Sequence, residues 1–481
     1  MKSERSPGYD DGRRGNGQPV VDTLAQAGVG YAYPWRVGFA AAMGGFLFGY
    51  DTGIIGGAMT SLEEHFQMNA AQLGASVAIV FVGCILGAIC GGFFSDRFGR
   101  RRVLFATAWM FLLSAVLTAI PQTIAQFNIA RFVGGVGIGI SLPVAGVYLA
   151  EISPARVRGR MVSLNQLAIT FGILVSYVVG WFVADIGSEA WQIATSWRWT
   201  FGTEALPAAL FAVVLMLIPE SPRWLIQQGR TDEALAVLTR IDGPETARRE
   251  IDEIRRVIDE EDVAITQLLK PGLRIALIIG IMLSLFDQIT GINIVIYYIQ
   301  KILLQVGFSK EAAGQGMIAL GVVNFLTTIL ALALLDRVGR KPLLMFCPLG
   351  MSIAMLLLGF QFYTEMLPPI FVLVTIILYS FFYALGLGPG ILLLLSEIFP
   401  THVRGKAAGV CTVFMWVSCY FVSEQFPTWL EWSQSGTFWI LSGTSFTMFL
   451  FVWLLIPETK GKTLEEIEQF WRRRGGARKN G

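Results

Sequence analysis

Charged residues are scarce in this chain of 481 residues, of which they make up 15%, while hydrophobic residues make up 54%. Soluble domains carry about 25% charged residues, so the composition excludes an ordinary soluble protein. The formal net charge is only +2. This balance gives no electrostatic reason to expect a nucleic acid as a partner.

Histidine and cysteine are scarce too. The two histidines, His65 and His402, are too few for a histidine metal site or a proton relay within a membrane. We find no nucleophile–base set, phosphate-binding loop or metal cluster, so we expect neither an enzyme nor a cofactor or metal ion. The cysteines lie in apolar stretches without C-x-x-C spacing, which indicates buried free thiols: Cys84, Cys90, Cys347, Cys411 and Cys419.

An apolar start is also missing. Residues 1–34 are polar and rich in Gly, Asp and Arg, so we expect a disordered cytoplasmic tail rather than a cleavable signal peptide. Beyond them, long apolar runs dominate, each near the roughly 20 residues that a membrane-spanning helix needs. Twelve spans are predicted: 37–59, 72–94, 103–121, 126–149, 161–184, 198–218, 273–298, 315–335, 342–361, 369–394, 406–426 and 436–456.

A polar interval divides these spans into two sets of six. Within it, Thr231 begins a capped amphipathic segment, and Ile251, Ile254 and Val257 recur at helical spacing, which favours short helices over a floppy linker. Five regions are therefore predicted: the tail at 1–34, an N-terminal six-helix bundle at 35–225, a cytoplasmic helical domain at 226–271, a C-terminal six-helix bundle at 272–457, and a cytoplasmic helix and tail at 458–481.

The absence of lysine and arginine from alternate links predicts the orientation. Neither residue occurs in five of the links: 60–71, 122–125, 185–197, 362–368 and 427–435. The opposite links and both tails are basic, with Arg198, Lys301 and Lys310 as the exceptions to the alternation. Because cytoplasmic loops carry the excess of positive charge, both termini are predicted in the cytoplasm, in a multi-pass protein of the cell membrane.

The basic links contain motifs that occur twice. Residues 95–101 resemble 335–341, residues 150–160 resemble 396–406, and 219–221 resemble 457–459, all at nearly one offset. Three matches at one spacing indicate an ancient duplication. Two homologous membrane halves are the architecture of many alternating-access transporters.

Six short motifs occur in order along the chain: Gly49-Tyr50-Asp51-Thr52-Gly53, residues 96–101 and 219–225, Gly291-Ile292-Asn293, Tyr297-Tyr298 and residues 457–461. Together they resemble the sugar-porter branch of the major facilitator superfamily. The resemblance implies an all-α membrane protein with twelve transmembrane helices in two pseudo-symmetric six-helix bundles, the major facilitator fold, and a monosaccharide site at the midplane.

Two carboxyl groups, Asp51 and Asp287, stand inside predicted spans, where an Asp costs roughly 2.5–3.5 kcal/mol. Arg131 is the expected cationic partner of Asp51, and a site balanced between burial and pairing can switch with protonation. Asp51 and Arg131 are therefore predicted to couple transport to protons, with a permanent structural ion pair as the alternative. The resemblance favours coupling, because proton-coupled bacterial sugar porters have Asp in this motif and facilitative animal members commonly have Asn.

A sugar needs a partner for each hydroxyl that leaves water, and side-chain amides supply both donor and acceptor. A helix break near Gly291 would turn Gln288 and Asn293 towards one cavity, although hydrogen bonding between helices is the alternative role for such amides. By resemblance, the sugar-binding positions are Gln166, Gln288, Asn293 and Asn324, with the aromatic residues Phe48, Tyr297 and Trp416.

Three positions depart from the family pattern. Asp287 stands where the family usually has Gln, Leu392 where it often has Trp, and Met415 where an amide often precedes the Trp. Asp287 is therefore predicted as a substrate residue that binds two hydroxyls or acts as a second protonatable group, which puts a glucose or xylose selectivity in doubt. Residues 386–390, with three glycines and a proline, predict a bendable tenth span.

The duplicated motifs also place acids near arginines at cytoplasmic helix ends. Pairs across the two halves would hold the cytoplasmic side shut, and several exposed pairs of about 0–1 kcal/mol each could set a two-state balance. Positive-inside charge with local helix capping is the alternative. The predicted gate residues are Asp96, Arg97, Glu151, Arg158, Glu220, Arg223, Asp336, Arg337, Glu397, Arg404 and Glu458.

The sequence thus predicts a symporter of a proton and a monosaccharide, a hexose or a pentose, that works by alternating access. Its partners are the sugar, the proton and the lipid bilayer, and we expect a monomer. A facilitative uniporter for a sugar or polyol is the alternative. A non-transporting sugar sensor is disfavoured, because the stretch after residue 457 is short for a signalling extension.

Overall fold

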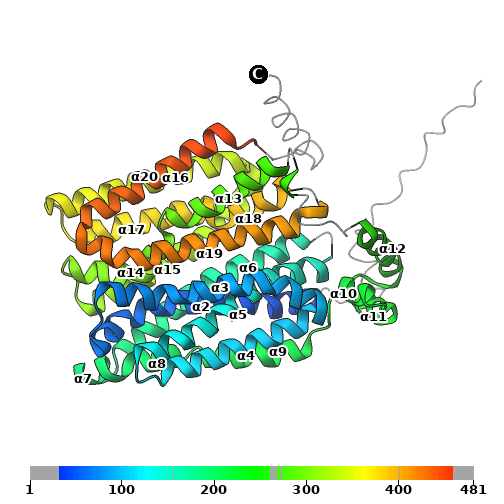
Figure 1. The fold of residues 1–481 in the computed structure, drawn as a ribbon, viewed down its shortest axis with the longest axis horizontal. Helices are drawn as coiled ribbons and strands as arrows, with labels where there is room; N and C mark the ends of the chain where they lie inside the picture. The colour runs from blue at the N-terminus through cyan, green and yellow to red at the C-terminus, as the bar shows by residue number, and fades with distance from the viewer. Residues whose placement is uncertain (1–31, 155–156, 261–267, 271–272, 400, 459–481) are drawn as a thin grey trace, which may run out of the picture.

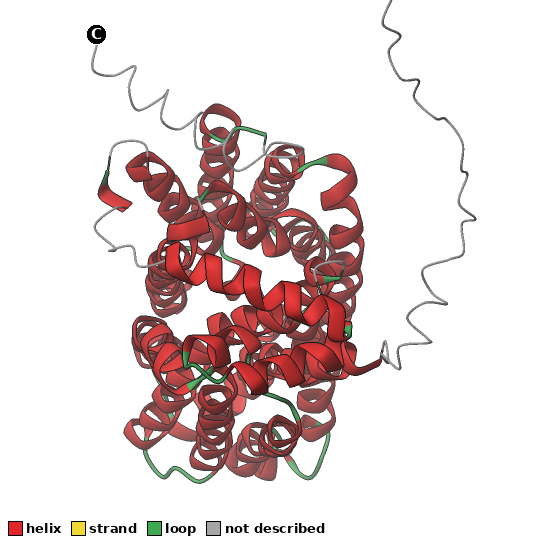
Figure 2. Ribbon diagram, turned by 90° about the vertical axis from the view of Figure 1, so that its right-hand side faces the viewer, coloured by secondary structure: helices red, strands yellow, loops and turns green. Residues whose placement is uncertain are grey.

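The computed structural model describes residues 32–154, 157–260, 268–270, 273–399 and 401–458. The regular elements of these residues are helices (Figure 2). The predicted tails at 1–34 and 458–481 lie almost wholly outside the described residues. The five cysteines are free, as predicted, and all but Cys90 are buried.

The first half of the chain contains six helical spans. Five are long single helices: α2 (Ala32–Phe66), α3 (Ala70–Phe98), α4 (Arg100–Ala119), α5 (Ile124–Ile152) and α6 (Arg158–Ala184). The sixth contains a π-helical turn and is built from four pieces: α7 (Glu189–Trp191), η1 (Gln192–Ser196), α8 (Trp197–Gly202) and α9 (Ala205–Leu217).

The second half repeats this plan with two interrupted spans. The seventh span is α13 (Leu273–Ile289) followed by α14 (Ile292–Gln305), and the tenth is α17 (Ile370–Phe382), the π-helical η3 (Tyr383–Leu387) and α18 (Gly388–Ile398). The remaining four are single helices: α15 (Lys310–Val338), α16 (Arg340–Thr364), α19 (Thr401–Trp432) and α20 (Gln434–Leu455).

The two halves lie side by side as two helical bundles. Figure 1 shows the N-terminal half, in blue and cyan, below the C-terminal half, in green to red, with the long helices running nearly in one direction. Figure 2 views the same helices end-on. Helices contact across the boundary between the halves, where α3 meets α19, α15 meets α6, and α14 meets α2.

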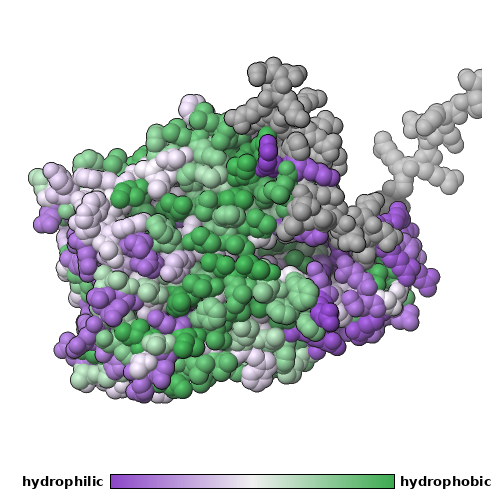
Figure 3. Space-filling model, in the orientation of Figure 1, coloured by the Kyte–Doolittle hydropathy of each residue, from purple (hydrophilic) through white to green (hydrophobic). Residues whose placement is uncertain are grey.

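In the described part of the chain, eleven helical segments are long and apolar enough to cross a membrane by length and composition. Large apolar side chains on them are exposed, including Leu206 at 78%, Phe346 at 68% and Ile129 at 64%. Figure 3 shows hydrophobic residues over the middle of one face and hydrophilic residues towards both ends. Because an apolar belt of this kind needs lipid around it, the protein is a multi-pass membrane protein.

The twelfth long helix is α2, which is less apolar because it carries Asp51 and seven glycines. The glycines allow close packing: a Cβ atom at Gly49 would lie 1.9 Å from the carbonyl oxygen of Ile169 on α6, and one at Gly172 would lie 2.2 Å from that of Phe46. The packing buries α2 against neighbouring helices. The predicted all-α architecture of twelve spans in two six-helix bundles is confirmed.

Three short helices lie at one end of the bundle (Figure 1): α10 (Pro222–Gln227), α11 (Thr231–Asp242) and α12 (Pro244–Glu260). They enclose a small core of their own, made of Trp224, Leu225, Ile226, Ala234, Leu238, Ala247 and Ile251. We call this end of the bundle the domain end, and the opposite end, where α7 lies, the α7 end.

Two predicted boundaries differ from the structure. Helix α2 begins at Ala32, inside the predicted tail, and α10 begins at Pro222, inside the predicted first bundle. Several helices are also longer than the apolar segments from which they were predicted. Helix α19, for example, covers 32 residues, because backbone hydrogen bonding continues where side chains become polar.

Candidate functional site

Asp51 of α2 and Arg131 of α5 form a buried ion pair. One guanidinium nitrogen of Arg131 donates to Oδ1 of Asp51, and the side chains are 2% and 4% exposed respectively. The guanidinium also lies over the ring of Phe201, 5.6 Å from its centroid, which is a cation–π contact. The pairing explains how a carboxyl group is accommodated within a membrane-spanning helix.

A third charged group, which the sequence analysis missed, lies beside this pair. Glu204, just before α9, is 1% exposed, and its Oε1 has no hydrogen-bond partner among the described residues. It interacts electrostatically with both Asp51 and Arg131. Two acids thus lie within electrostatic range of one guanidinium, so these three groups are neutral together only when one acid holds a proton. The burial cost that selected Asp51 in the sequence applied equally to Glu204, inside the predicted span 198–218.

The seventh span is broken at Gly291, as predicted. Gly291 has φ of 102°, a left-handed conformation that glycine adopts without steric cost. Nδ2 of Asn293 donates to Oε1 of Gln288 at 2.8 Å and also approaches Sγ of Cys419 at 3.1 Å. The break therefore joins two amides that a spacing of five residues would place on different faces of a regular helix.

Asp287 lies at the end of this chain of hydrogen bonds. Nε2 of Gln288 donates to its Oδ2 at 2.7 Å, and the hydroxyl of Tyr383 donates to its Oδ1 at 3.1 Å. Tyr383 is the first residue of η3, in the span that was predicted to bend. Single π-helical turns occur frequently at functional sites.

Tyr297 connects the two buried clusters. It lies on α14, is 3% exposed, and interacts electrostatically with Asp51 and Arg131 as well as with Cys419. Cys419 in turn contacts Asn293, and we refer to the charged residues of the N-terminal half and the amides of the C-terminal half together as the polar region.

Aromatic rings from both halves border this region. Phe81 of α3 lies 6.2 Å from Tyr297 and 5.7 Å from Trp416, and Phe48 of α2 meets Trp416 edge-on at 5.7 Å between centroids. Trp416 is 2% exposed, and its Nε1 has no hydrogen-bond partner among the described residues. The aromatic group thus contains a buried donor that a ligand can use.

Gln166 and Asn324 differ in how they relate to these clusters. In hydrogen bonds that involve a side chain, each of them takes part only through its backbone carbonyl, which accepts from a threonine hydroxyl. A Cβ atom at Gly388 would lie 3.5 Å from both Nε2 of Gln166 and Cε1 of Tyr383, so Gln166 of α6 reaches the junction of η3 and α18. Asn324 is buried on α15, but no hydrogen bond of the described residues joins its side chain to the network.

The motif acids Glu151 and Glu397 have arginine partners within their own halves in this structure, whereas the predicted pairs between the halves concern a state in which the cytoplasmic side is shut. Glu151 accepts two hydrogen bonds from Arg100, at 2.9 and 3.1 Å, and Glu397 accepts one from Arg340 at 3.0 Å. The prediction did not include Arg100 or Arg340. Each follows a glycine with positive φ, 98° at Gly99 and 107° at Gly339, and such a turn directs the next helix back over its own half.

Two further acids cap helices of their own half. Glu220 accepts from the backbone N–H of Arg101 at 3.0 Å, and Glu458 accepts from that of Lys341 at 3.2 Å. A carboxylate at a helix N-terminus satisfies unpaired N–H groups and opposes the helix dipole. Local capping, the alternative from the sequence, therefore accounts for these two positions.

The remaining predicted gate residues have varied surroundings. Asp96 is 73% exposed and lies 3.2 Å from Arg100, Arg97 lies over the ring of Phe98, and Arg404 donates to the carbonyl of Phe399 at 3.3 Å. Arg158, Arg223 and Arg337 lie on α6, α10 and α15. The side chain of Asp336 is not among those that the structure describes.

The two halves meet closely at the α7 end. The hydroxyl of Tyr177 donates to the carbonyl of Ile296 at 2.8 Å, and a Cβ atom at Gly74 would lie 2.0 Å from the carbonyl oxygen of Glu424. These contacts join α6 to α14 and α3 to α19. The α7 end of the interface is therefore closed.

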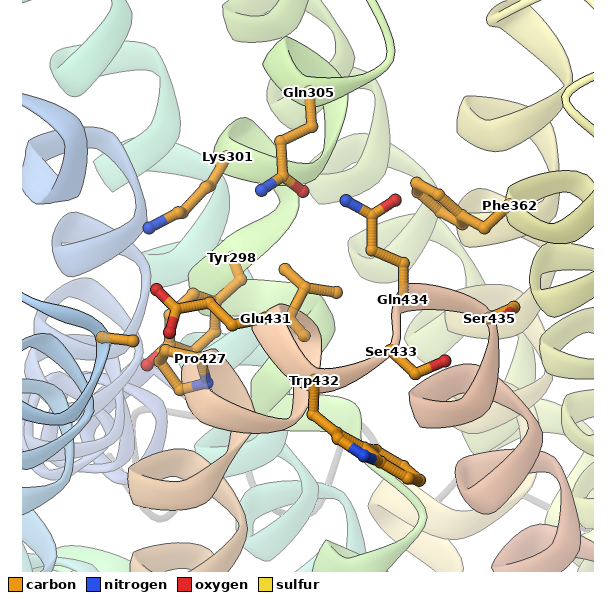
Figure 4. A pocket seen from close by; sticks show the side chains of 12 residues that line it. Tyr298, Lys301, Gln305, Phe362, Pro427, Glu431, Trp432, Ser433, Gln434 and Ser435 are labelled. Atoms are coloured by element: carbon orange, nitrogen blue, oxygen red, sulfur yellow. The ribbon is translucent and has the colours of Figure 1, made fainter.

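A cavity of about 500 Å³ opens at the α7 end, away from the polar region described above. Figure 4 shows Lys301, Gln305 and Gln434 around it. Its lining includes Tyr298, Trp432 and Glu431 but none of the predicted site residues.

Comparison with known proteins gives a consistent result over most of the chain. The family described as "Sugar (and other) transporter" matches residues 37–471. The arabinose-proton symporter of Bacillus subtilis is 38% identical over 456 residues, covering 94% of this chain and 98% of that protein. The D-xylose-proton symporter of Escherichia coli is 38% identical over 473 residues, covering 92% and 96%.

Solved structures agree with these relatives. The chain is similar to the xylose transporter XylE from E. coli in a partially occluded inward open conformation, with a TM-score of 0.81 and 36% identity over 90% of this chain and all of that one. The inward open conformation of the same transporter gives a TM-score of 0.81 at 37% identity, over 91% and 100%.

Proposed function

The chain belongs to the sugar (and other) transporter family, and from that membership we propose that it carries a monosaccharide together with protons. The family makes it a membrane transporter and not an enzyme. The observation that supports proton coupling best is the buried cluster in which Asp51 pairs with Arg131 and Glu204 interacts electrostatically with both. Two relatives of similar sequence are named proton symporters, of arabinose and of D-xylose.

Proton binding acts on the contact between α2 and α5. An ionised Asp51 holds Arg131, whereas a protonated Asp51 is neutral and releases most of that attraction. Glu204 then remains as the acid that balances the guanidinium, so the buried cation keeps a counter-charge throughout. Exchange of Arg131 between two acids lets α2 and α5 change their packing without burying an unpaired charge.

The sugar site is proposed at the polar region between the halves. Gln288 and Asn293 present amides from the broken seventh span, and Gln166 and Asn324 have side-chain amides without a partner among the described residues. The rings of Phe48 and Trp416 cover the apolar face of a sugar, and the indole N–H of Trp416 can donate to a hydroxyl. A pentose or hexose has the hydroxyl groups that this set would satisfy.

The conformation follows from the closed end of the interface between the halves, and the orientation in the membrane follows from the distribution of Lys and Arg. Lys and Arg are concentrated in the links at the domain end, so we place this end in the cytoplasm and the α7 end outside. With the α7 end closed, the structure corresponds to an inward-facing state. Pairs of motif residues between the halves belong to the opposite state, and cross-linking of Glu151→Cys to Arg404→Cys only under outward-facing conditions would support them.

One chain is the proposed transport unit. The charged cluster and the amide network both lie within the helices of a single protomer, and neither needs a residue from another copy. We therefore propose a monomer in the cell membrane. Its mass in a nanodisc, combined with full transport activity at one copy per vesicle, tests this.

The central experiment is uptake of labelled xylose, arabinose or glucose into proteoliposomes with an imposed pH gradient and the membrane potential clamped at zero. Each coupled proton contributes about tenfold accumulation per pH unit, since one unit is about 1.4 kcal/mol. Asp51→Asn should lower the accumulation ratio about tenfold while counterflow of sugar at equal pH is kept.

Asp185→Asn is the matched control, because Asp185 is an exposed acid at the end of α6, and it should accumulate sugar as the unmodified protein does. Facilitated flux without any accumulation would replace symport by uniport. If none of these sugars crosses faster than in empty liposomes, monosaccharide transport is excluded.

A further inference from the structure

Asp287 is a buried carboxyl group that the charged cluster does not neutralise. It is 7% exposed on α13, and in the described part of the chain its interactions are with uncharged groups. Asp51, in contrast, faces the guanidinium of Arg131. Burial of an ionised carboxylate without a cation is among the most unfavourable arrangements in a protein, and such a group becomes neutral by taking up a proton.

The carboxylate of Asp287 is the acceptor at the end of the hydrogen bonds around it. Asn293 donates to Gln288, Gln288 donates to Oδ2 of Asp287, and Tyr383 donates to Oδ1. Donors stabilise the ionised form of a carboxyl group, so this arrangement holds Asp287 between its two protonation states. Loss of either donor would favour the protonated form.

Both donors belong to parts of the protein that a sugar and the change of conformation affect. Gln288 is a proposed sugar ligand, so a hydroxyl that binds it competes with Asp287 for its amide. Tyr383 begins the π-helical turn of the tenth span, and its ring lies near Gln166 of the opposite half. Movement of the halves against each other therefore changes the surroundings of Tyr383, the second donor.

Among the described residues, the groups that interact with Asp287 from neighbouring helices do not supply a competing charge. They are the hydroxyls of Tyr379 on α17 and Tyr383 on η3, and the thiol of Cys419 on α19. Tyrosine and cysteine are ordinarily neutral near pH 7. Asp287 is therefore the one carboxyl group among these residues that can bind and release a proton during transport.

We propose that Asp287 is a second proton-binding site, separate from Asp51, and that two protons accompany each sugar. This proposal rests on the proposed symport, and it assigns a role to the residue at which the chain departs most clearly from its family. One proton is carried by the charged cluster of the N-terminal half and the other by the amide network of the C-terminal half.

The test is the equilibrium accumulation ratio in proteoliposomes at a pH difference of one unit and zero membrane potential, with xylose or the sugar that gives the fastest counterflow. Two protons give a ratio of about 100 and one proton about 10, at tenfold per proton. Asp287→Asn and Asp51→Asn should each give about 10, and the double variant about 1. Asp185→Asn should keep the ratio of about 100.

A direct count of protons taken up per sugar by the unmodified protein, with a pH-sensitive dye, keeps the test independent of the folding of any variant. A count of one, or an Asp287→Asn variant that retains the full ratio, overturns the proposal while leaving symport intact. A ratio of 1 for the unmodified protein instead contradicts the proposed symport itself, so the two failures are distinguishable.

Discussion

Lys301 of α14 and Glu63 of α2 form an ion pair between the two halves at the α7 end, with Nζ 2.8 Å from each carboxylate oxygen. The side chains are 24% and 27% exposed, so water screens part of their attraction. Lys301 lies on the broken seventh span, beyond Gly291, so the pair joins α14 to α2 at the closed end of the interface.

Loss of this pair should favour opening of the α7 end. Glu63→Gln removes one partially exposed ion pair, worth up to about 1 kcal/mol, so the ratio of closed to open protein should fall by up to about fivefold. Labelling of a cysteine placed at Ala70, which lines the cavity at that end, measures the opening. The charge-swapped double variant Glu63→Lys, Lys301→Glu should restore slow labelling, and equal labelling of all three proteins would exclude a locking role.

Gln288 should contribute directly to sugar binding. Gln288→Ala leaves Asn293 without its acceptor and a sugar hydroxyl without a partner, which costs about 1–3 kcal/mol, or about 5- to 150-fold in the dissociation constant. Equilibrium binding of labelled sugar to the purified protein measures this change.

Gln315→Ala is a suitable control for that measurement, because Gln315 is an exposed amide on α15 that contacts Glu311. Its dissociation constant should equal that of the unmodified protein. An unaltered constant for Gln288→Ala as well would remove Gln288 from the sugar site.

The duplicated arginines should differ in their contribution to stability. Arg100 and Glu151 have side-chain exposures of 6% and 9%, whereas Arg340 and Glu397 have 14% and 22%. Arg100→Ala leaves a buried carboxylate unpaired and should destabilise by about 3–5 kcal/mol. Arg340→Ala should cost less, about 1–3 kcal/mol, because water reaches Glu397 more easily.

Thermal unfolding in detergent compares the two variants. Arg97→Ala serves as the control, because Arg97 is exposed and its described contact is with the ring of Phe98, and its melting temperature should stay near that of the unmodified protein. Equal decreases in melting temperature for Arg100→Ala and Arg340→Ala would show that the difference in burial between the two copies of the motif does not affect stability.

The sequence identified a site residue where burial of that residue type within an apolar span is energetically unfavourable. Asp51 was identifiable because a carboxyl group inside an apolar run carries a large burial cost. Arg131 was its one obvious partner. Glu204 met the same criterion near the start of its span, but it was not predicted as a site residue. The break at Gly291 was predictable from the spacing of Gln288 and Asn293, although their hydrogen bond required the folded chain.

Pairing between distant residues was the least predictable feature. Arg100 and Arg340, which pair with Glu151 and Glu397 in this structure, were not among the predicted gate residues. The direction of a side chain after a sharp glycine turn depends on backbone angles that composition does not reveal. The relation of Gln166 to Tyr383 likewise depends on how two bundles of similar shape are placed against each other.

The sequence by itself determined the number of spans, the duplication and the chemistry available between the helices, because hydropathy and the burial cost of charge act on each segment separately. Only the tertiary structure decided which acids share Arg131, which amides meet at Asp287, and which end of the interface is closed. Those features depend on the packing of helices far apart in the chain, and packing is set by the shapes of all the side chains together.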